Sequence, residues 1–233
     1  MKYEEDRVSI PIGDKDRTSG IISLPAKIDR RMGVVIAHGA GNDMNTPLVA
    51  FFADGLARAG YPVLRFNFLY KEDGRRAPDN GQTLAKTWAE ALSYAKGRLE
   101  AKVDVWVAAG KSMGGRIAAL MVADGLLPVH RLIFLGYPLH PAGEREKVRA
   151  ADLDRIKIPM LFFAGTRDPL CDMAGLKEVL QRVTAPQSFL LSKEGTTPFM
   201  FRRRLTKRKK KSSLASSRRA SRGWQCPHDA PYS

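Results

Sequence analysis

The residues best suited to chemistry form the pattern Gly-x-Ser-x-Gly at residues 110–114, with the serine at Ser112. An apolar run at residues 103–109 comes directly before this pattern, and the apolar helical segment 117–122 follows it. A sharp strand-to-helix turn of this kind holds a serine in a strained conformation with its hydroxyl exposed, and it needs small residues because larger side chains would clash. We therefore expect Ser112 to be a nucleophile for acyl transfer rather than part of a merely structural turn.

A second glycine-rich turn, His-Gly-Ala-Gly at residues 38–41, follows an earlier apolar run. Acyl transfer needs backbone N–H groups that stabilise a negatively charged oxygen, and glycines permit their close approach. We expect one such amide from Ala40 or Gly41 and a second from Met113, although a plain strand-to-helix turn is the alternative. His38 is expected to stabilise the loop and not to act as the base, because it precedes the serine, whereas the expected order is serine, acid, histidine.

The candidate acid is Asp168, which comes shortly after the apolar run 160–164. A carboxylate at this place would accept the Nδ1 proton of the base and stabilise the imidazolium that forms during attack. The alternative role, capping a helix that starts near residue 173, suits Asp172 better. Asp168 is therefore the predicted acid of a serine, acid and histidine triad.

Strands alternate with helices along most of the chain. Two extended segments, 8–12 and 19–24, flank a polar turn and predict an antiparallel hairpin. We expect further strands at residues 33–37, 61–68, 103–109, 131–137, 160–164 and 188–191, with helices near 48–59, 83–99, 117–122 and 173–183. This alternation implies right-handed crossovers and a mostly parallel sheet covered on both faces. The predicted fold class is a three-layer α/β core over residues 1–194, with the hairpin as an antiparallel edge.

These motifs together resemble the α/β-hydrolase superfamily, and more closely its small dienelactone-hydrolase-like branch, which includes the hydrolase-like domain of a testis-expressed protein. The motifs that carry the resemblance lie at residues 38–41, 69–76, 110–116, 136–141 and 165–168. The resemblance covers residues 1 to about 194. It implies a lidless core with a Ser, Asp, His triad, no cofactor, and a small carboxyl ester or lactone as substrate, without identifying that substrate.

The histidine that would complete the triad is missing from its expected place. The family has a Gly-Asp-His-Ser-Phe type of segment after its last strand, where this chain has Gly-Thr-Thr-Pro-Phe at residues 195–199. With suitable synonymous codons, a two-base shift of the reading frame converts Gly-Thr-Thr-Pro-Phe-Met-Phe into Asp-His-Ser-Phe-His-Val-Pro. We infer that residues from Thr196 onward are frameshifted and expect impaired activity, with His140 as a less suitable base because it precedes the acid.

The net charge of +15 is concentrated at the end of the chain. Residues 195–233 hold eleven of the 39 Lys and Arg residues and a single acidic residue, Asp229. We expect this segment to be a basic tail that is non-native or disordered. The rival interpretation is a catalytically inactive scaffold or interaction module whose tail binds nucleic acid. No nucleic-acid-binding motif surrounds Phe201 or Trp224, so nucleic acid is not expected as a partner.

Composition excludes several other classes. No apolar run approaches the roughly 18 residues that cross a bilayer, and the charged first residues lack the apolar region of a signal peptide. We therefore expect a cytoplasmic location and no membrane partner. Only Cys171 and Cys226 are present, too few for a disulfide scaffold or a thiolate metal site. The sequence predicts no oligomeric state.

Overall fold

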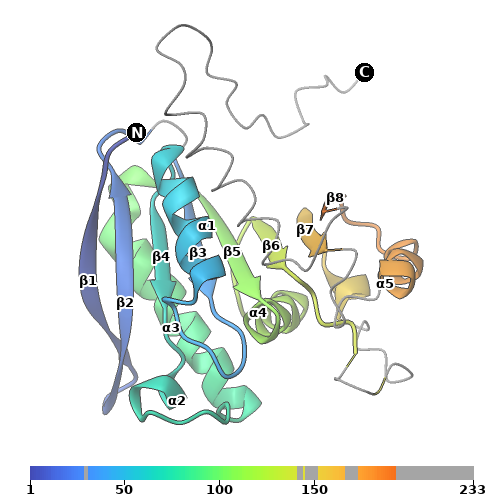
Figure 1. Ribbon diagram of the computed structural model, residues 1–233, viewed down its shortest axis with the longest axis horizontal. Coiled ribbons are helices and arrows are strands. Elements are labelled where there is room, and N and C mark those ends of the chain that lie inside the picture. The colour runs from blue at the N-terminus through green and yellow to red at the C-terminus, as the bar shows by residue number, and fades with distance from the viewer. Residues whose placement is uncertain (29–30, 141–143, 145–151, 166–172, 193–233) are drawn as a thin grey trace, which may run out of the picture.

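The computed structural model of the chain describes residues 1–28, 31–140, 144, 152–165 and 173–192 (Figure 1). Within this part, eight strands form one sheet in the order β1-β2-β4-β3-β5-β6-β7-β8. The strands are β1 (Tyr3–Ile12), β2 (Asp16–Pro25), β3 (Met32–Ala37), β4 (Val63–Phe66), β5 (Val105–Lys111), β6 (Arg131–Leu135), β7 (Met160–Gly165) and β8 (Gln187–Ser192). The helices are α1 (Pro47–Arg58), α2 (Leu69–Glu72), α3 (Gly81–Leu99), α4 (Met113–Ala123) and α5 (Met173–Leu180), and two short 3-10 helices lie at Glu100–Lys102 and Leu153–Arg155.

The sheet is parallel except at one side. Strand β1 pairs with β2, and β2 with β4, in antiparallel fashion, whereas β4, β3 and β5 to β8 pair in parallel. The parallel strands are short and apolar because both of their faces are covered. The predicted three-layer α/β fold and its antiparallel hairpin are confirmed.

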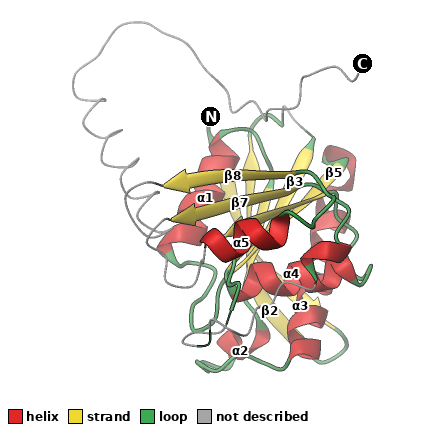
Figure 2. Cartoon of the chain, turned by 90° about the vertical axis from the view of Figure 1, so that its right-hand side faces the viewer, coloured by secondary structure: helices red, strands yellow, loops and turns green. Residues whose placement is uncertain are grey.

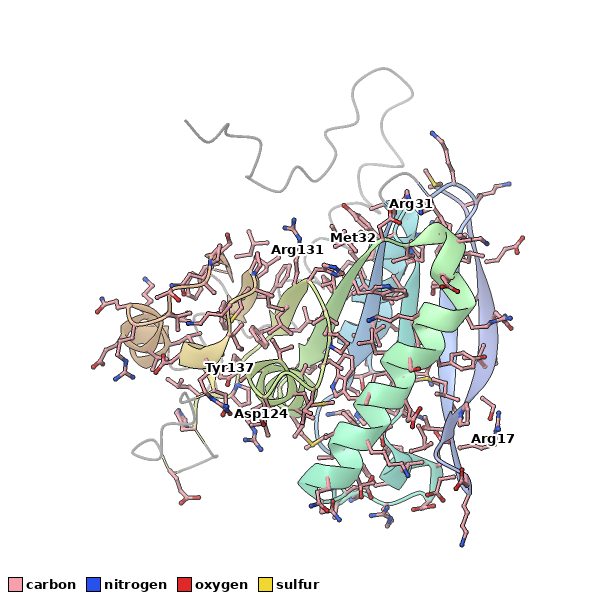
Figure 3. The ribbon with its side chains drawn as sticks, turned by 180° about the vertical axis from the view of Figure 1, so that it is seen from behind. Arg17, Arg31, Met32, Asp124, Arg131 and Tyr137 are labelled. Atoms are coloured by element: carbon pink, nitrogen blue, oxygen red, sulfur yellow. The ribbon has the colours of Figure 1, made fainter. Side chains whose placement is uncertain are left out.

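Helices cover the two faces of the sheet unequally. Figure 1 shows α1 in front of the sheet, and Figure 3 shows α3 in front of it from the opposite side. Helix α1 packs Leu48, Val49 and Phe52 against residues of the central strands, including Val34 and Ile36. Helices α3, α4 and α5 contribute to the larger core cluster on the other face (Figure 2). The burial of both faces fixes the sheet between the helix layers, which keeps the strand ends in place.

The carboxyl ends of the parallel strands meet at one edge of the sheet. In Figure 3, Met32 and Arg131 mark the amino ends of β3 and β6, and Tyr137 lies beyond the carboxyl end of β6. The register pairs Ala37 with Gly110, so β3 and β5 end side by side. Sites in open α/β sheets form in the crevice outside this edge.

Several local features differ from expectation. The short helix α2 is not among the elements expected from the sequence, and its Tyr70 N–H donates to the Asp79 carboxylate at 3.0 Å. Helix α4 starts at Met113 and not at residue 117. Its first turn escaped prediction because it contains glycines, which are poor helix formers. Helix α5 ends at Leu180, earlier than residue 183. The boundary at residue 194 and the tail 195–233 lie outside the described residues.

Two properties of the described residues bear on membranes and metals. None of the helices there is long and apolar enough to cross a membrane. Nor do three His, Cys, Asp or Glu side chains gather there as donors for a metal ion.

Candidate active site

The turn that carries Ser112 joins β5 to α4 and leaves no room for additional side chains. A Cβ atom added to Gly110 would lie 2.2 Å from the Gly115 nitrogen, and one added to Gly114 would lie 2.5 Å from the His38 carbonyl oxygen. Both contacts are with backbone, which cannot rotate away as a flexible side chain does. The close packing of strand, turn and helix therefore requires glycine at these positions.

Ser112 has an unusual backbone conformation, with φ of 47° and ψ of −111°. Strained conformations of this kind typically cost about 1–3 kcal/mol and occur at functional sites. Two hydrogen bonds hold it: the Ser112 N–H donates to the Gly136 carbonyl at 3.1 Å, and the Ser112 carbonyl accepts the Arg116 N–H at 3.0 Å. The Ser112 hydroxyl makes no capping hydrogen bond with α4. The hydroxyl of this strained serine is thus not used to cap the helix that follows it.

The His-Gly-Ala-Gly loop lies directly beside Ser112. A Cβ atom added to Gly39 would lie 3.3 Å from the Lys111 carbonyl oxygen and 3.6 Å from the Ser112 Cβ atom. Gly39 is buried at this contact, whereas Ala40 and Gly41 are exposed. The structure therefore brings together the predicted nucleophile and the loop expected to supply one oxyanion amide.

The second expected donor, the Met113 amide, begins helix α4. The first N–H groups of a helix have no acceptor within the helix and form the positive end of its dipole. Among the described residues, no backbone carbonyl accepts a hydrogen bond from the Met113 or Ala40 amide. These N–H groups, one directly after Ser112 and one in the loop beside it, are of the kind that stabilises an oxygen that becomes negative.

His38 is buried and uses both of its ring nitrogens within the loop. Its Nδ1 lies 2.8 Å from the Gly39 carbonyl oxygen, and its Nε2 accepts the Phe68 N–H at 3.1 Å. The imidazole is therefore neutral, with its proton on Nδ1. Burial lowers the pKa of His38, against the opposing effects of the Gly39 carbonyl and Asp43. As expected from the sequence, His38 holds the loop, and it is unsuited to act as the base.

The predicted acid follows the end of β7. This strand ends at Gly165, two strands away from β5 at the carboxyl edge. Asp168 itself lies outside the described residues, as do Asp172 and Cys171. The assignment of Asp168 therefore stays a prediction.

The other described histidines differ in position. His130 lies toward the opposite edge, where its Nδ1 accepts the Trp106 N–H at 3.0 Å. His140 follows β6 at the carboxyl edge, and its side chain is only 3% exposed. In the same loop, burial raises the pKa of Tyr137 far above its usual value, so this phenol stays neutral. Of the described histidines, His38 and His140 therefore lie at the carboxyl edge, and His130 does not.

Residues after β4 also hold the loop, although the sequence suggested no role for them. Asn67 Oδ1 accepts the Met44 N–H at 2.9 Å, which ties the loop to the end of β4. The Tyr70 ring packs edge-on against His38, with ring centroids 5.8 Å apart. The sequence does show a polar residue, Asn67, directly after the apolar run of β4. Its role in holding the loop could be predicted only by knowing that β4 is the neighbour of β3.

Comparison with known proteins confirms the resemblance that the motifs suggested. A dienelactone hydrolase from Anabaena variabilis superimposes with a TM-score of 0.71 and 20% identity, covering 91% of this chain and 96% of that chain. An alpha-beta serine hydrolase homologue from Coxiella burnetii has a TM-score of 0.68 and 22% identity, covering 92% and 99%. An esterase from Pyrococcus furiosus has a TM-score of 0.70 and 16% identity, covering 90% of each chain. These structures share the fold, and a family model described as an alpha/beta hydrolase domain matches residues 30–224, so this chain belongs to the alpha/beta hydrolase domain family.

Proposed function

We propose that this chain is a serine hydrolase of small carboxyl esters or lactones, with Ser112 as nucleophile, and that its turnover is impaired by the missing triad histidine. The observation that carries the proposal is the strained Ser112, whose hydroxyl is not used to cap α4 and which lies against Gly39. The dienelactone hydrolase and the esterase that share its fold support this substrate class.

In the proposed reaction, the Ser112 oxygen attacks the carbonyl carbon while a base takes the hydroxyl proton. The carbonyl electron pair moves onto its oxygen, which the Met113 amide and an amide of Ala40 or Gly41 stabilise. The tetrahedral intermediate then collapses, its carbon–oxygen bond to the alcohol breaks, and the base returns the proton to that alcohol. A lactone would open its ring at this step. Water then attacks the acyl-enzyme in the same way and releases the acid and free Ser112.

Asp168 would orient the base and stabilise its charged form. The base is expected after β8, where the sequence has Thr196 and Thr197 instead of Asp and His. Serine is a weak nucleophile without a base, so the chain as written is expected to turn over slowly. His140, which precedes the acid in the chain, is the other candidate to accept the proton, and loss of Ser112-dependent turnover in a His140→Ala variant of the chain as written would assign it that role.

The hydrolase proposal is tested on a frame-restored chain, in which Asp-His-Ser-Phe follows Gly195 and the rest of the tail continues in the restored frame. Its hydrolysis of p-nitrophenyl acetate and of dihydrocoumarin, a lactone, would be measured beside a Ser112→Ala variant. We expect Ser112→Ala to lower turnover by up to about a millionfold, the scale found for triad serines. Ser93→Ala, which removes an exposed hydroxyl from α3, is the matched control and should leave turnover unchanged.

The inactive scaffold is the other possible outcome. Folded, frame-restored protein with no Ser112-dependent turnover of either substrate would contradict the hydrolase proposal and favour a binding role for the fold.

A further inference from the structure

The loop beside Ser112 contains a tight turn whose geometry separates its amides. The Asn42 N–H donates to the Gly39 carbonyl at 3.3 Å, which closes a four-residue turn with Ala40 and Gly41 at its centre. Gly41 has φ of +71°, whereas the φ of Ala40 is not positive, because Arg31 and Ser112 are the only described non-glycine residues with positive φ. Positive φ at the third residue alone defines a type II turn.

In a turn of this type, the central peptide group presents its carbonyl on one side and its N–H on the other. The Ala40 carbonyl accepts a hydrogen bond from the Asn42 side-chain amide at 3.1 Å. The Gly41 N–H belongs to the same peptide group and must point the opposite way. The Ala40 N–H belongs to the preceding peptide group, so the two candidate oxyanion amides do not share a direction.

The Gly41 N–H is near enough to the Tyr70 hydroxyl to influence it. Burial raises the pKa of Tyr70, and the backbone N–H of Gly41 lowers it. The Tyr70 side chain is fully buried, and no described group forms a hydrogen bond of ordinary geometry with its hydroxyl. A phenol oxygen can accept an N–H, and the Gly41 amide is the backbone N–H that influences this oxygen.

Tyr70 is itself held firmly in place. Its N–H donates to the Asp79 carboxylate at 3.0 Å, and Asp79 is paired with Arg75. Its ring packs against His38, whose Nε2 accepts the Phe68 N–H. The hydroxyl is thus a fixed point against which the exposed turn can be oriented.

We propose that Tyr70 is a positioning residue of the oxyanion hole: its hydroxyl accepts the Gly41 N–H, and this orients the turn so that the Ala40 amide, together with Met113, faces the substrate oxygen. The inference rests on the proposed hydrolase function for its catalytic consequence. It assigns to Tyr70 an effect on the transition state without any contact with substrate, since its hydroxyl is buried.

The contact is tested without any turnover. In isotope-labelled full-length chain, solvent-exchange NMR would report the exchange rate of the Gly41 amide in the parent and in Tyr70→Phe. Loss of an acceptor hydrogen bond should raise Gly41 exchange by up to about tenfold while Asn42 stays unchanged. Tyr94→Phe, which removes a hydroxyl from the distant helix α3, is the matched control. Unchanged Gly41 exchange in Tyr70→Phe, or an equal change in Tyr94→Phe, would overturn the proposal.

The catalytic consequence is tested on the frame-restored chain with p-nitrophenyl acetate. Tyr70→Phe should lower kcat by roughly tenfold to a hundredfold with little change in KM, because misplaced amides weaken transition-state stabilisation and leave substrate binding intact. An unchanged kcat would overturn the positioning role even if the Gly41 contact is found. Absence of turnover in the frame-restored parent would instead contradict the hydrolase function itself, and the Gly41 exchange would still decide whether Tyr70 holds the turn.

Discussion

Replacing Gly110 by alanine tests whether the turn between β5 and α4 has room for one methyl group. The new Cβ atom would lie 2.2 Å from the Gly115 nitrogen and 2.5 Å from the Gly114 carbonyl carbon. Ordinary contact begins at 3.4 Å, so α4 must move away from β5 by roughly 1 Å. Helix α4 cannot make this movement freely, because Ile117 is packed in the core.

The energetic cost follows from this geometry. Forcing an extra methyl group into a packed interior typically costs about 1–3 kcal/mol, and here the opposing atoms are all backbone. We therefore expect Gly110→Ala to lower the free energy of unfolding by about 3 kcal/mol. Gly97→Ala is the matched control, because a Cβ atom added there in α3 meets nothing within 4 Å. That change should stabilise the protein by about 0.5–1 kcal/mol, the usual gain of alanine over glycine in a helix.

Urea denaturation followed by circular dichroism gives both free energies by linear extrapolation. Gly115→Ala provides a milder step, since its added Cβ atom would lie 2.9 Å from the Gly110 carbonyl oxygen. Its loss of stability should fall between those of the other two variants, which keeps the test usable if Gly110→Ala does not fold. A Gly110→Ala protein as stable as Gly97→Ala would refute the tight packing inferred for the Ser112 turn.

Two further predictions concern groups that hold this turn and its neighbouring loop. Burial lowers the pKa of His38, so the unfolded chain binds a proton at this imidazole more readily than the folded chain does. The free energy of unfolding should therefore fall as the pH drops below about 6.5. The His38→Gln variant should lose this part of the pH dependence. Urea titrations near about pH 7.5 and about pH 5 measure it, and identical pH dependence in both proteins would argue against a neutral, buried His38. Trp88→Phe removes the indole N–H that donates to the Gly114 carbonyl at 3.0 Å. It should destabilise the fold by about 1–3 kcal/mol more than Trp106→Phe does. Trp106 is the control because its indole N–H makes no hydrogen bond among the described residues. Equal losses in urea denaturation of the two tryptophan variants would contradict that role.

The features predicted correctly from the sequence are those specified by neighbouring residues. The strand, the glycine turn and the helix around Ser112 are contiguous in the chain, so a local pattern predicts their arrangement. The run that forms β3 is apolar throughout because both faces of the sheet are covered, and this composition is visible without knowing its partners.

The features that escaped prediction depend on contacts between distant segments. The hydrogen bonds from Met44 to Asn67 and from Phe68 to His38 form because β3 and β4 are neighbours in the sheet. A local sequence pattern does not predict which strands are neighbours. Strand β1 begins at Tyr3, well before the predicted residue 8, because its first residues are mostly exposed and polar and show little apolar alternation, although they pair with β2. Such pairing is set by the hairpin as a whole.

Ser112 is proposed to be a nucleophile that lacks its base. The most direct test compares p-nitrophenyl acetate turnover by the chain as written with that of the frame-restored chain, each beside its Ser112→Ala variant. We predict Ser112-dependent turnover in the frame-restored chain that exceeds the chain as written by several orders of magnitude, up to about a millionfold. Equal, Ser112-dependent turnover in the two chains would contradict the account, because a base such as His140 would then already be in place.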